Sequence, residues 1–168
     1  MRCVACLLLA LAAGCSDPSA GADAAVDATP YALSVRPHDG SDAGIELRLG
    51  FQGFRYTRVV LAASGAVPAS TPGRVRLEIE GFDPAEQRVR AVAFREVSAG
   101  RFETAPLMVY ANDITLSRAA GRPASLRVEL DDGAHRASAT LSGAVRWDPN
   151  CVEDAEFRCV PPGDGGAP

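Results

Sequence analysis

Alternation of apolar and polar residues constrains the fold of this chain more than any other feature of its sequence. The segments at 45–51, 75–79, 126–130 and 137–147 place apolar residues at every second position, with charged or small residues between them. Successive side chains of a β-strand point to opposite faces, so a period of two predicts strands with one apolar and one polar face. Such strands are typical of antiparallel sheets that are covered on one side and solvated on the other.

Turn signals divide this region into about eight strands. They are expected at 32–36, 44–51, 54–62, 73–80, 87–97, 101–110, 124–131 and 135–147, and Ile114 with Leu116 adds a short ninth. The segment Asp131-Asp132-Gly133 carries the Asp-Gly signal of a tight hairpin. These short, evenly spaced strands predict an all-β fold, an antiparallel two-sheet β-sandwich of immunoglobulin-like or fibronectin-like size. A small closed β-barrel is the alternative.

The N-terminus carries an export signal. Arg2 is followed by an apolar run of ten residues, 4–13, and then by Gly14-Cys15. This run is too short to cross a bilayer, which takes about 20 residues, and has the length of a signal-peptide core. The segment resembles the lipobox signal of bacterial lipoproteins. An ordinary secretory peptide cut near Ala13, which would leave Cys15 as a plain thiol, is the alternative.

The resemblance to lipoproteins implies a site of modification and a location. In that class a peptidase cuts before the cysteine, and the cysteine thiol is then lipidated. Here this implies a signal peptide at 1–14, lipid on Cys15 and attachment to a membrane of the cell envelope. Because Ser16 rather than an aspartate follows the cysteine, the resemblance favours the outer membrane in an organism with two membranes.

Composition divides the rest of the chain into three parts. Residues 15–29 hold the lipidated cysteine and an Ala- and Asp-rich stretch with almost no large apolar residue, which predicts a flexible acidic linker. Residues 30–148 form the β-domain. Residues 149–168 contain a cysteine loop and a tail rich in Pro and Gly, which we expect to be disordered.

The five cysteines are consistent with an exported protein. Cleavage would remove Cys3 and Cys6 and lipidation would consume Cys15, which leaves Cys151 and Cys159. We expect these two to form a disulfide in an oxidising compartment. Two cysteines separated by seven residues lack the further ligands of a zinc site. No metal and no cofactor is therefore expected.

The basic residues limit the chemistry that the chain can perform. All 17 are arginine, and the formal net charge is −4. The absence of lysine excludes lysine-dependent covalent catalysis, and the acidic balance argues against a nucleic-acid partner. No Gly-x-Ser-x-Gly motif is present. We therefore expect no enzyme and no catalytic residue; a hydrolase with a site around His38 or His135 is the less favoured alternative.

One aromatic cluster indicates a weak ligand-binding site. Phe51, Phe54 and Tyr56 lie within six residues of one another, and Arg55 and Arg58 stand beside them. These rings either form a platform for a ligand or fill the core. The sequence thus predicts a non-catalytic envelope protein that binds an envelope protein or a glycan, with a carbohydrate-binding module as an alternative. It gives no indication of the oligomeric state.

Overall fold

A computed structural model describes residues 31–41, 44–50, 53–111 and 114–147, together with the backbone of 29–30, 152–153 and 159–160. The elements are β1 (Thr29–Pro30), β2 (Ala32–Pro37), β3 (Ile45–Leu49), β4 (Arg55–Ser64), β5 (Ser70–Ile79), β6 (Ala85–Ser98), β7 (Arg101–Thr104), β8 (Leu107–Tyr110), α1 (Leu116–Ala119), β9 (Pro123–Asp131), β10 (His135–Trp147), β11 (Val152–Glu153) and β12 (Cys159–Val160). The predicted all-β class is confirmed.

The ninth strand predicted through Ile114 and Leu116 is wrong. Leu116 instead begins the one-turn helix α1, and both Leu116 and Ala119 are buried against the core. Two apolar residues spaced by two fit a short strand, but the burial of positions 116 and 119 follows the helical spacing of three.

In the described part of the chain, no helix is long and apolar enough to cross a membrane.

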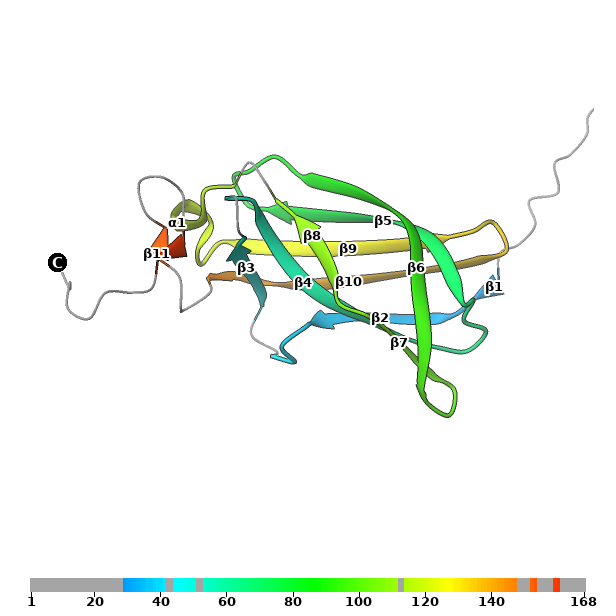
Figure 1. The fold of residues 1–168 in the computed structure, drawn as a ribbon. Helices are drawn as coiled ribbons and strands as arrows, with labels where there is room; N and C mark the ends of the chain where they lie inside the picture. The colour runs from blue at the N-terminus through cyan, green and yellow to red at the C-terminus, as the bar shows by residue number, and fades with distance from the viewer. Residues whose placement is uncertain are drawn as a thin grey trace, which may run out of the picture.

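Seven strands close into a barrel in the order β10-β3-β4-β7-β6-β5-β9, and β9 pairs again with β10 (Figure 1). The strands β1, β2 and β8 pair with members of this ring. The predicted two-sheet sandwich is therefore wrong, and the small closed barrel, the alternative, is the architecture found.

Closure of the barrel depends on two strands that change partner along their length. The first half of β6, at 85–93, pairs with β5, and its second half, at 94–98, pairs with β7. On the other side, β10 pairs with β9 at 136–144 and runs parallel to β3 at 145–147. A sandwich and a barrel need the same alternation of polarity, so the sequence pattern did not distinguish them.

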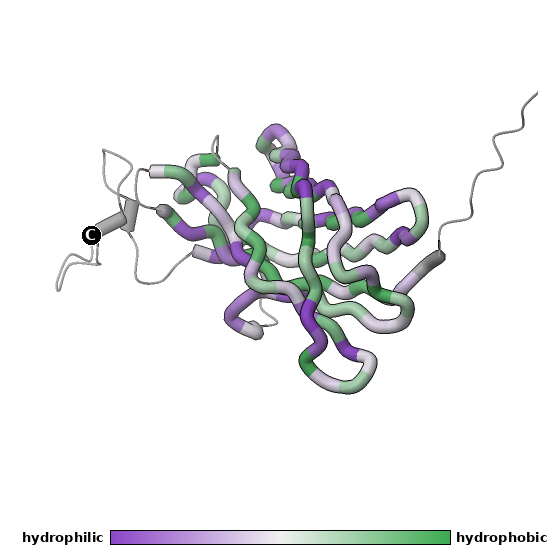
Figure 2. Tube along the Cα trace, turned by 45° about the vertical axis from the view of Figure 1, so that its right-hand side comes forward, coloured by the Kyte–Doolittle hydropathy of each residue, from purple (hydrophilic) through white to green (hydrophobic). Residues whose placement is uncertain are grey.

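The apolar half of each alternating strand fills the barrel interior. Figure 2 shows hydrophobic and hydrophilic residues alternating along the strands. The largest fully buried side chains are Ile45, Leu47, Leu61, Leu77, Leu116, Leu126, Leu130, Val59, Val75, Val92, Val109 and Val128. Full burial of one such side chain stabilises the fold by about 1.5–3 kcal/mol.

Strand β4 is flanked on each edge by an interrupted strand. β2 and β3 follow one edge, and β7 and β8 follow the other. Between β7 and β8 one extra residue enters, because Glu103 lies opposite Ala62 while Leu107 lies opposite Val59. At this bulge the N–H of Leu61 donates to the hydroxyl of buried Thr104 at 3.1 Å. Before the bulge β7 pairs with both β4 and β6, whereas beyond it β8 pairs with β4 alone among the described strands.

Candidate functional site

The outward side of β4 and β8 carries the largest group of exposed apolar side chains in the described residues. Tyr56 lies opposite Tyr110, and Arg58 lies opposite Met108. Met108 is 45% exposed and Tyr110 is 38% exposed. We call the surface made by Phe54, Tyr56, Arg58, Met108 and Tyr110 the β8 face.

Alternation along both strands aims these side chains outward. Thr57 and Val109, which lie opposite each other between the outward pairs, are 3% and 1% exposed and face the interior. Their burial fixes the register, because a slip of one residue would turn Tyr56 and Tyr110 into the core. The packing of the barrel therefore determines which side chains the β8 face presents.

The ring of Phe54 contacts the rings of both tyrosines. Its ring centroid lies 5.8 Å from that of Tyr56 and 5.5 Å from that of Tyr110, at interplanar angles of 41° and 64°. The chain can turn back at this point because Gly50 has no side chain: a Cβ there would lie 2.6 Å from the Phe54 ring. The rings therefore form an inclined cluster rather than a flat platform.

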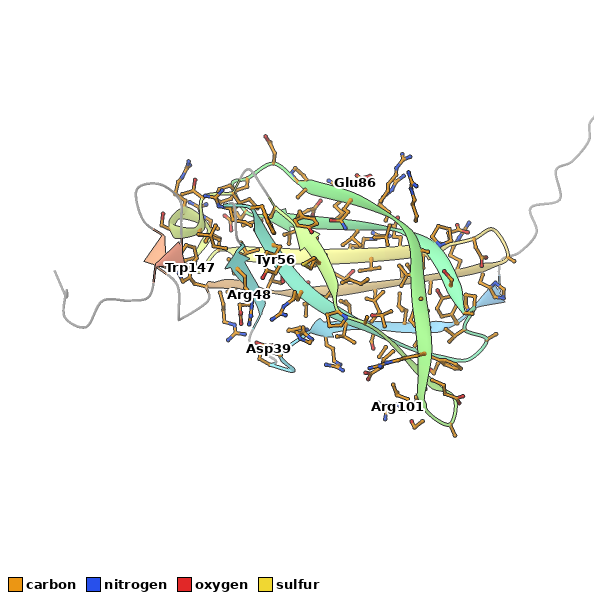
Figure 3. The ribbon with its side chains drawn as sticks, viewed as in Figure 1. Asp39, Arg48, Tyr56, Glu86, Arg101 and Trp147 are labelled. Carbon is orange, nitrogen blue, oxygen red and sulfur yellow. The ribbon has the colours of Figure 1, made fainter. Side chains whose placement is uncertain are left out.

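Arginines flank this cluster. Arg48 lies opposite Tyr56, as Figure 3 shows, and its Nε donates to Glu46 at 2.5 Å. The Nε of Arg58 is buried and has no hydrogen-bond partner in the described part of the chain. An unsatisfied buried donor is costly, and the cost is larger for a charged group. Arg58, which also lines the depression beside His38, therefore adds a positive charge next to the aromatic cluster.

The outer edge of β8 is bridged by a side chain instead of a strand. Nε2 of Gln87 donates to the carbonyl oxygen of Met108 at 3.2 Å, and the N–H of Tyr110 donates to Oε1 of Gln87 at 3.4 Å. The inner edge of β8 pairs with β4, and no described strand pairs with its outer edge. One glutamine therefore satisfies two backbone groups of an otherwise open edge.

Only some of the residues predicted to bind a ligand lie together in the structure. Phe54, Tyr56 and Arg58 lie on the β8 face. Arg55 alternates to the other side of β4, where its Nη1 donates to the carbonyl oxygen of Gly53 at 3.3 Å. Phe51 lies outside the described residues.

Sequence reasoning missed Met108, Tyr110 and Gln87. Tyr110 and Met108 occupy alternate positions of the strand predicted at 101–110, but only the pairing of that strand with β4 places them next to Tyr56. Nothing in the local sequence of Gln87 indicates its contact with β8, which joins residues 21 and 23 positions apart.

The two histidines do not share a site. Nδ1 of His135 lies 3.3 Å from Oδ2 of Asp132 within the β9–β10 turn, and the backbone N–H of His135 holds the pKa of Asp132 below its usual value. His38 follows β2 and lines a depression of only about 10 Å³. At about 3.3 Å per residue, the six residues of β2 keep the histidines near opposite ends of the barrel.

Asp39, which lines the depression next to His38, belongs to a small hydrogen-bond network. Asp39 accepts hydrogen bonds from the N–H and the hydroxyl of Ser41, at 3.0 and 2.9 Å, and the backbone bond is the main cause of its lowered pKa. Nη2 of Arg146 donates to the hydroxyl of Ser41 at 2.6 Å. In the described residues, no group of three or more His, Cys, Asp or Glu side chains could hold a metal ion.

The outward face of β5, β6 and β9 forms a charged groove of about 430 Å³. Its arginines are largely paired, with Arg74 to Glu86 at 3.2 Å, Arg76 to Glu78 at 2.7 Å and Arg127 to Glu129 at 2.7 Å. Exposed pairs of this kind contribute about 0–1 kcal/mol each. Because its charges already satisfy one another, this groove is a weaker candidate than the β8 face.

Comparison of the chain with protein-family models, curated proteins and solved structures found no match in any of the three. The predicted lipid-bearing Cys15 and the predicted disulfide between Cys151 and Cys159 lie outside the residues whose side chains are described. The lipid anchor and the disulfide remain predictions from the sequence.

Proposed function

We propose that the protein is a lipid-anchored, exported binding module that contacts another envelope protein through the β8 face and performs no catalysis itself. One observation carries this proposal: exposed Met108 and Tyr110 share a face with half-buried Arg58, whose Nε has no hydrogen-bond partner among the described residues. Tyr, Met and Arg are enriched in protein interfaces, and Tyr and Arg are among the commonest hot-spot residues.

The inclination of the rings favours a protein partner over a glycan. A sugar ring stacks best on an open, flat aromatic face, whereas Phe54 packs against Tyr56 and Tyr110 at 41° and 64°. Side chains of a protein can fill such an uneven surface and supply a carboxylate to Arg58 at the same time. The carbohydrate-binding alternative therefore has less support.

The predicted linker would allow the β8 face to lie at some distance from the membrane. A linker spanning 15–29 extends at most about 50 Å, at roughly 3.3 Å per residue. In Figure 1, the N-terminal strand β1 and the helix α1 lie at opposite ends of the barrel, and β8 lies on the side of the barrel between them. The β8 face could therefore meet a partner while the chain stays tethered at β1.

Site-specific photo-crosslinking in intact cells tests the proposal. A photoreactive amino acid at Met108 should give adducts of discrete mass, and these should weaken when Arg58→Glu is introduced. The same amino acid at Ser138, an exposed position on the outside of β10, serves as the control. Identical adducts from both positions, or adducts with glycan alone, would contradict a protein-binding β8 face.

A further inference from the structure

We propose that the β6–β7 hairpin, residues 94–102, lies against the anchoring membrane and binds its anionic lipid head groups. This inference rests on the proposed function, because the membrane in question is the one that would hold the lipid on Cys15. It goes further in assigning a second membrane contact, made by the folded domain itself, and in naming the end of the barrel that faces the bilayer.

The β6–β7 hairpin projects from the barrel. Four consecutive residues at the end of β6, 95–98, are all exposed. Successive residues of a strand point to opposite faces, so neither face of the hairpin is covered there. Figure 1 shows β6 and β7 extending past the rest of the barrel, and Figure 3 places Arg101 near the turn between them. Val97 is 46% exposed, the highest value among the large apolar side chains of the described residues.

The chain enters the barrel beside the base of this hairpin. The ring of Tyr31, which directly follows β1, contacts the ring of Phe94 with centroids 6.4 Å apart and an interplanar angle of 87°. Along the sheet, Ala32 lies opposite Ser64, and Ser64 lies opposite Arg101. At about 4.8 Å per strand spacing, Arg101 is about 10 Å from the start of β2. A tether that joins the chain at β1 therefore brings the hairpin close to the bilayer.

The predicted linker makes even a weak contact effective. As a flexible coil, residues 15–29 would span about 20 Å. This span exceeds the distance from the start of β2 to Arg101, so the hairpin can reach the lipid surface without stretching the linker. A short flexible tether gives the attached group a local concentration in the millimolar range. A contact too weak to hold the free protein on a membrane can therefore form in the anchored protein.

The outward side of the hairpin carries an excess of positive charge. Arg101 and Glu103 share this side of β7, and Arg95 lies directly opposite Glu103. Glu103 forms its ion pair with Arg36 of β2 at 3.3 Å. Within the described residues, Arg95 and Arg101 form no ion pair. Guanidinium groups bind phosphate oxygens through parallel hydrogen bonds, so these two arginines suit lipid phosphate groups.

The acidic groups near this end of the barrel have partners of their own. Glu96 lies on the side of β6 opposite to Arg95 and accepts the N–H of Gly100 at 2.9 Å. In the β9–β10 turn, Asp131 accepts from Arg136 at 2.8 Å. The hairpin thus combines an exposed apolar side chain with a basic outward side, as expected of a contact with an anionic lipid surface.

Quenching of tryptophan fluorescence by lipid tests this contact. A histidine tag in place of residues 1–15 would tether the chain to vesicles that contain a nickel-chelating lipid, so the assay does not depend on a lipid at Cys15. This exchange leaves every described residue in place. The vesicles hold phosphatidylglycerol and phosphatidylcholine with brominated acyl chains. In a Trp147→Phe background, Val97→Trp should give an emission that these vesicles quench.

The native tryptophan provides an internal control. Trp147 lies at the far end of β10 from His135, which pairs with β1. At about 3.3 Å per residue, the two ends are about 40 Å apart. Emission from Trp147 in the tagged chain without other changes should therefore not be quenched. Quenching of Trp147 would place the wrong end of the barrel on the membrane and overturn the proposal.

Charge variants test the recognition of anionic lipid. Arg95→Gln combined with Arg101→Gln should lower the ratio of docked to undocked hairpin roughly thirtyfold, because each arginine near an anionic surface contributes about fivefold. Arg88→Gln combined with Arg90→Gln is the matched control: it removes two exposed arginines from the half of β6 that pairs with β5 and should leave the quenching unchanged. Vesicles without phosphatidylglycerol should give little quenching.

Three results would overturn the proposal. Unquenched emission from Val97→Trp on tethered vesicles would refute the contact. Equal quenching without phosphatidylglycerol, or without the two hairpin arginines, would refute recognition of anionic lipid. If Val97→Trp perturbs the hairpin, hydrogen exchange in the tagged chain with its native hairpin decides: residues 97–101 should exchange more slowly on vesicles with phosphatidylglycerol than on vesicles without it, and equal exchange would refute the contact.

The two proposals fail separately. Lipid on Cys15 in cells together with unquenched emission from Val97→Trp would refute the hairpin contact and leave the anchor and the β8 face standing. Absence of lipid on Cys15 together with quenching in the tagged chain would refute the anchor and leave the hairpin as a lipid-binding element.

Discussion

The closure of the barrel at β3 and β10 can be tested with one added methyl group. Gly143 of β10 faces Gly44 at the entrance to β3, and a Cβ on Gly143 would lie 2.7 Å from the Cα of Gly44. Ordinary contact begins near 3.4 Å, so Gly143→Ala forces the two backbones apart by several tenths of an ångström. The nearest atom belongs to the main chain and cannot rotate away.

The loss of stability depends on the pairing between β10 and β3 that this displacement weakens. Val145, Arg146 and Trp147 pair with β3 directly beyond the contact, and Val145 and its partner Ile45 are 2% and 0% exposed. Overpacking of a tight interior costs about 1–3 kcal/mol. For a domain of this size, that loss lowers the melting temperature by roughly 4–10 °C.

Urea denaturation followed by tryptophan fluorescence measures this effect, since Trp147 is the single tryptophan and lies opposite Leu47 of β3. Ser142→Ala, on the adjacent exposed position of β10, provides the matched control and should change stability by less than about 0.5 kcal/mol. If Gly143→Ala left both the denaturation midpoint and the Trp147 emission unchanged, the close contact that seals the barrel would not exist.

Three further predictions concern the turn, the bulge and the anchor. Asp132 keeps its pKa below the usual 3.8 mainly because it accepts the N–H of His135, so the unfolded chain takes up its proton first as acidity increases. The free energy of unfolding should therefore fall as the pH drops below about 4, and Asp132→Asn should flatten this dependence in urea titrations between about pH 2 and pH 6. Thr104→Val removes the acceptor of the Leu61 N–H and should cost about 1–3 kcal/mol in chemical denaturation, whereas Thr104→Ser should cost less. Cys15→Ala should move the protein from the membrane fraction to the soluble fraction on cell fractionation; retention in the membrane would contradict the lipid anchor.

The strands could be read from the sequence because their physics is local. The alternation at 126–130 and 137–147 and the Asp-Gly turn between them predicted the hairpin of β9 and β10, which the structure confirms. The strand predicted at 101–110 is in fact two, β7 and β8, which are separated by Ala105 and Pro106 at a bulge. A bulge depends on the partner strand as much as on its own residues, so the pattern of one strand did not reveal it.

Only part of the candidate site could be predicted from the sequence, for the same reason. Phe54, Tyr56 and Arg58 are neighbours in sequence and could be proposed together. Their contacts with Tyr110 and Met108 depend on the register between β4 and β8, which join residues about fifty positions apart. Contacts of such long range follow from the whole topology rather than from a motif.

The split edge of β4 has a practical consequence. β2 and β3 are each held by their own ladder to β4, and the excursion between them leaves that edge. Gly40 lies in this excursion with open space around it. A short epitope inserted after Gly40 should therefore leave both registers intact and allow the folded protein to be detected with an antibody.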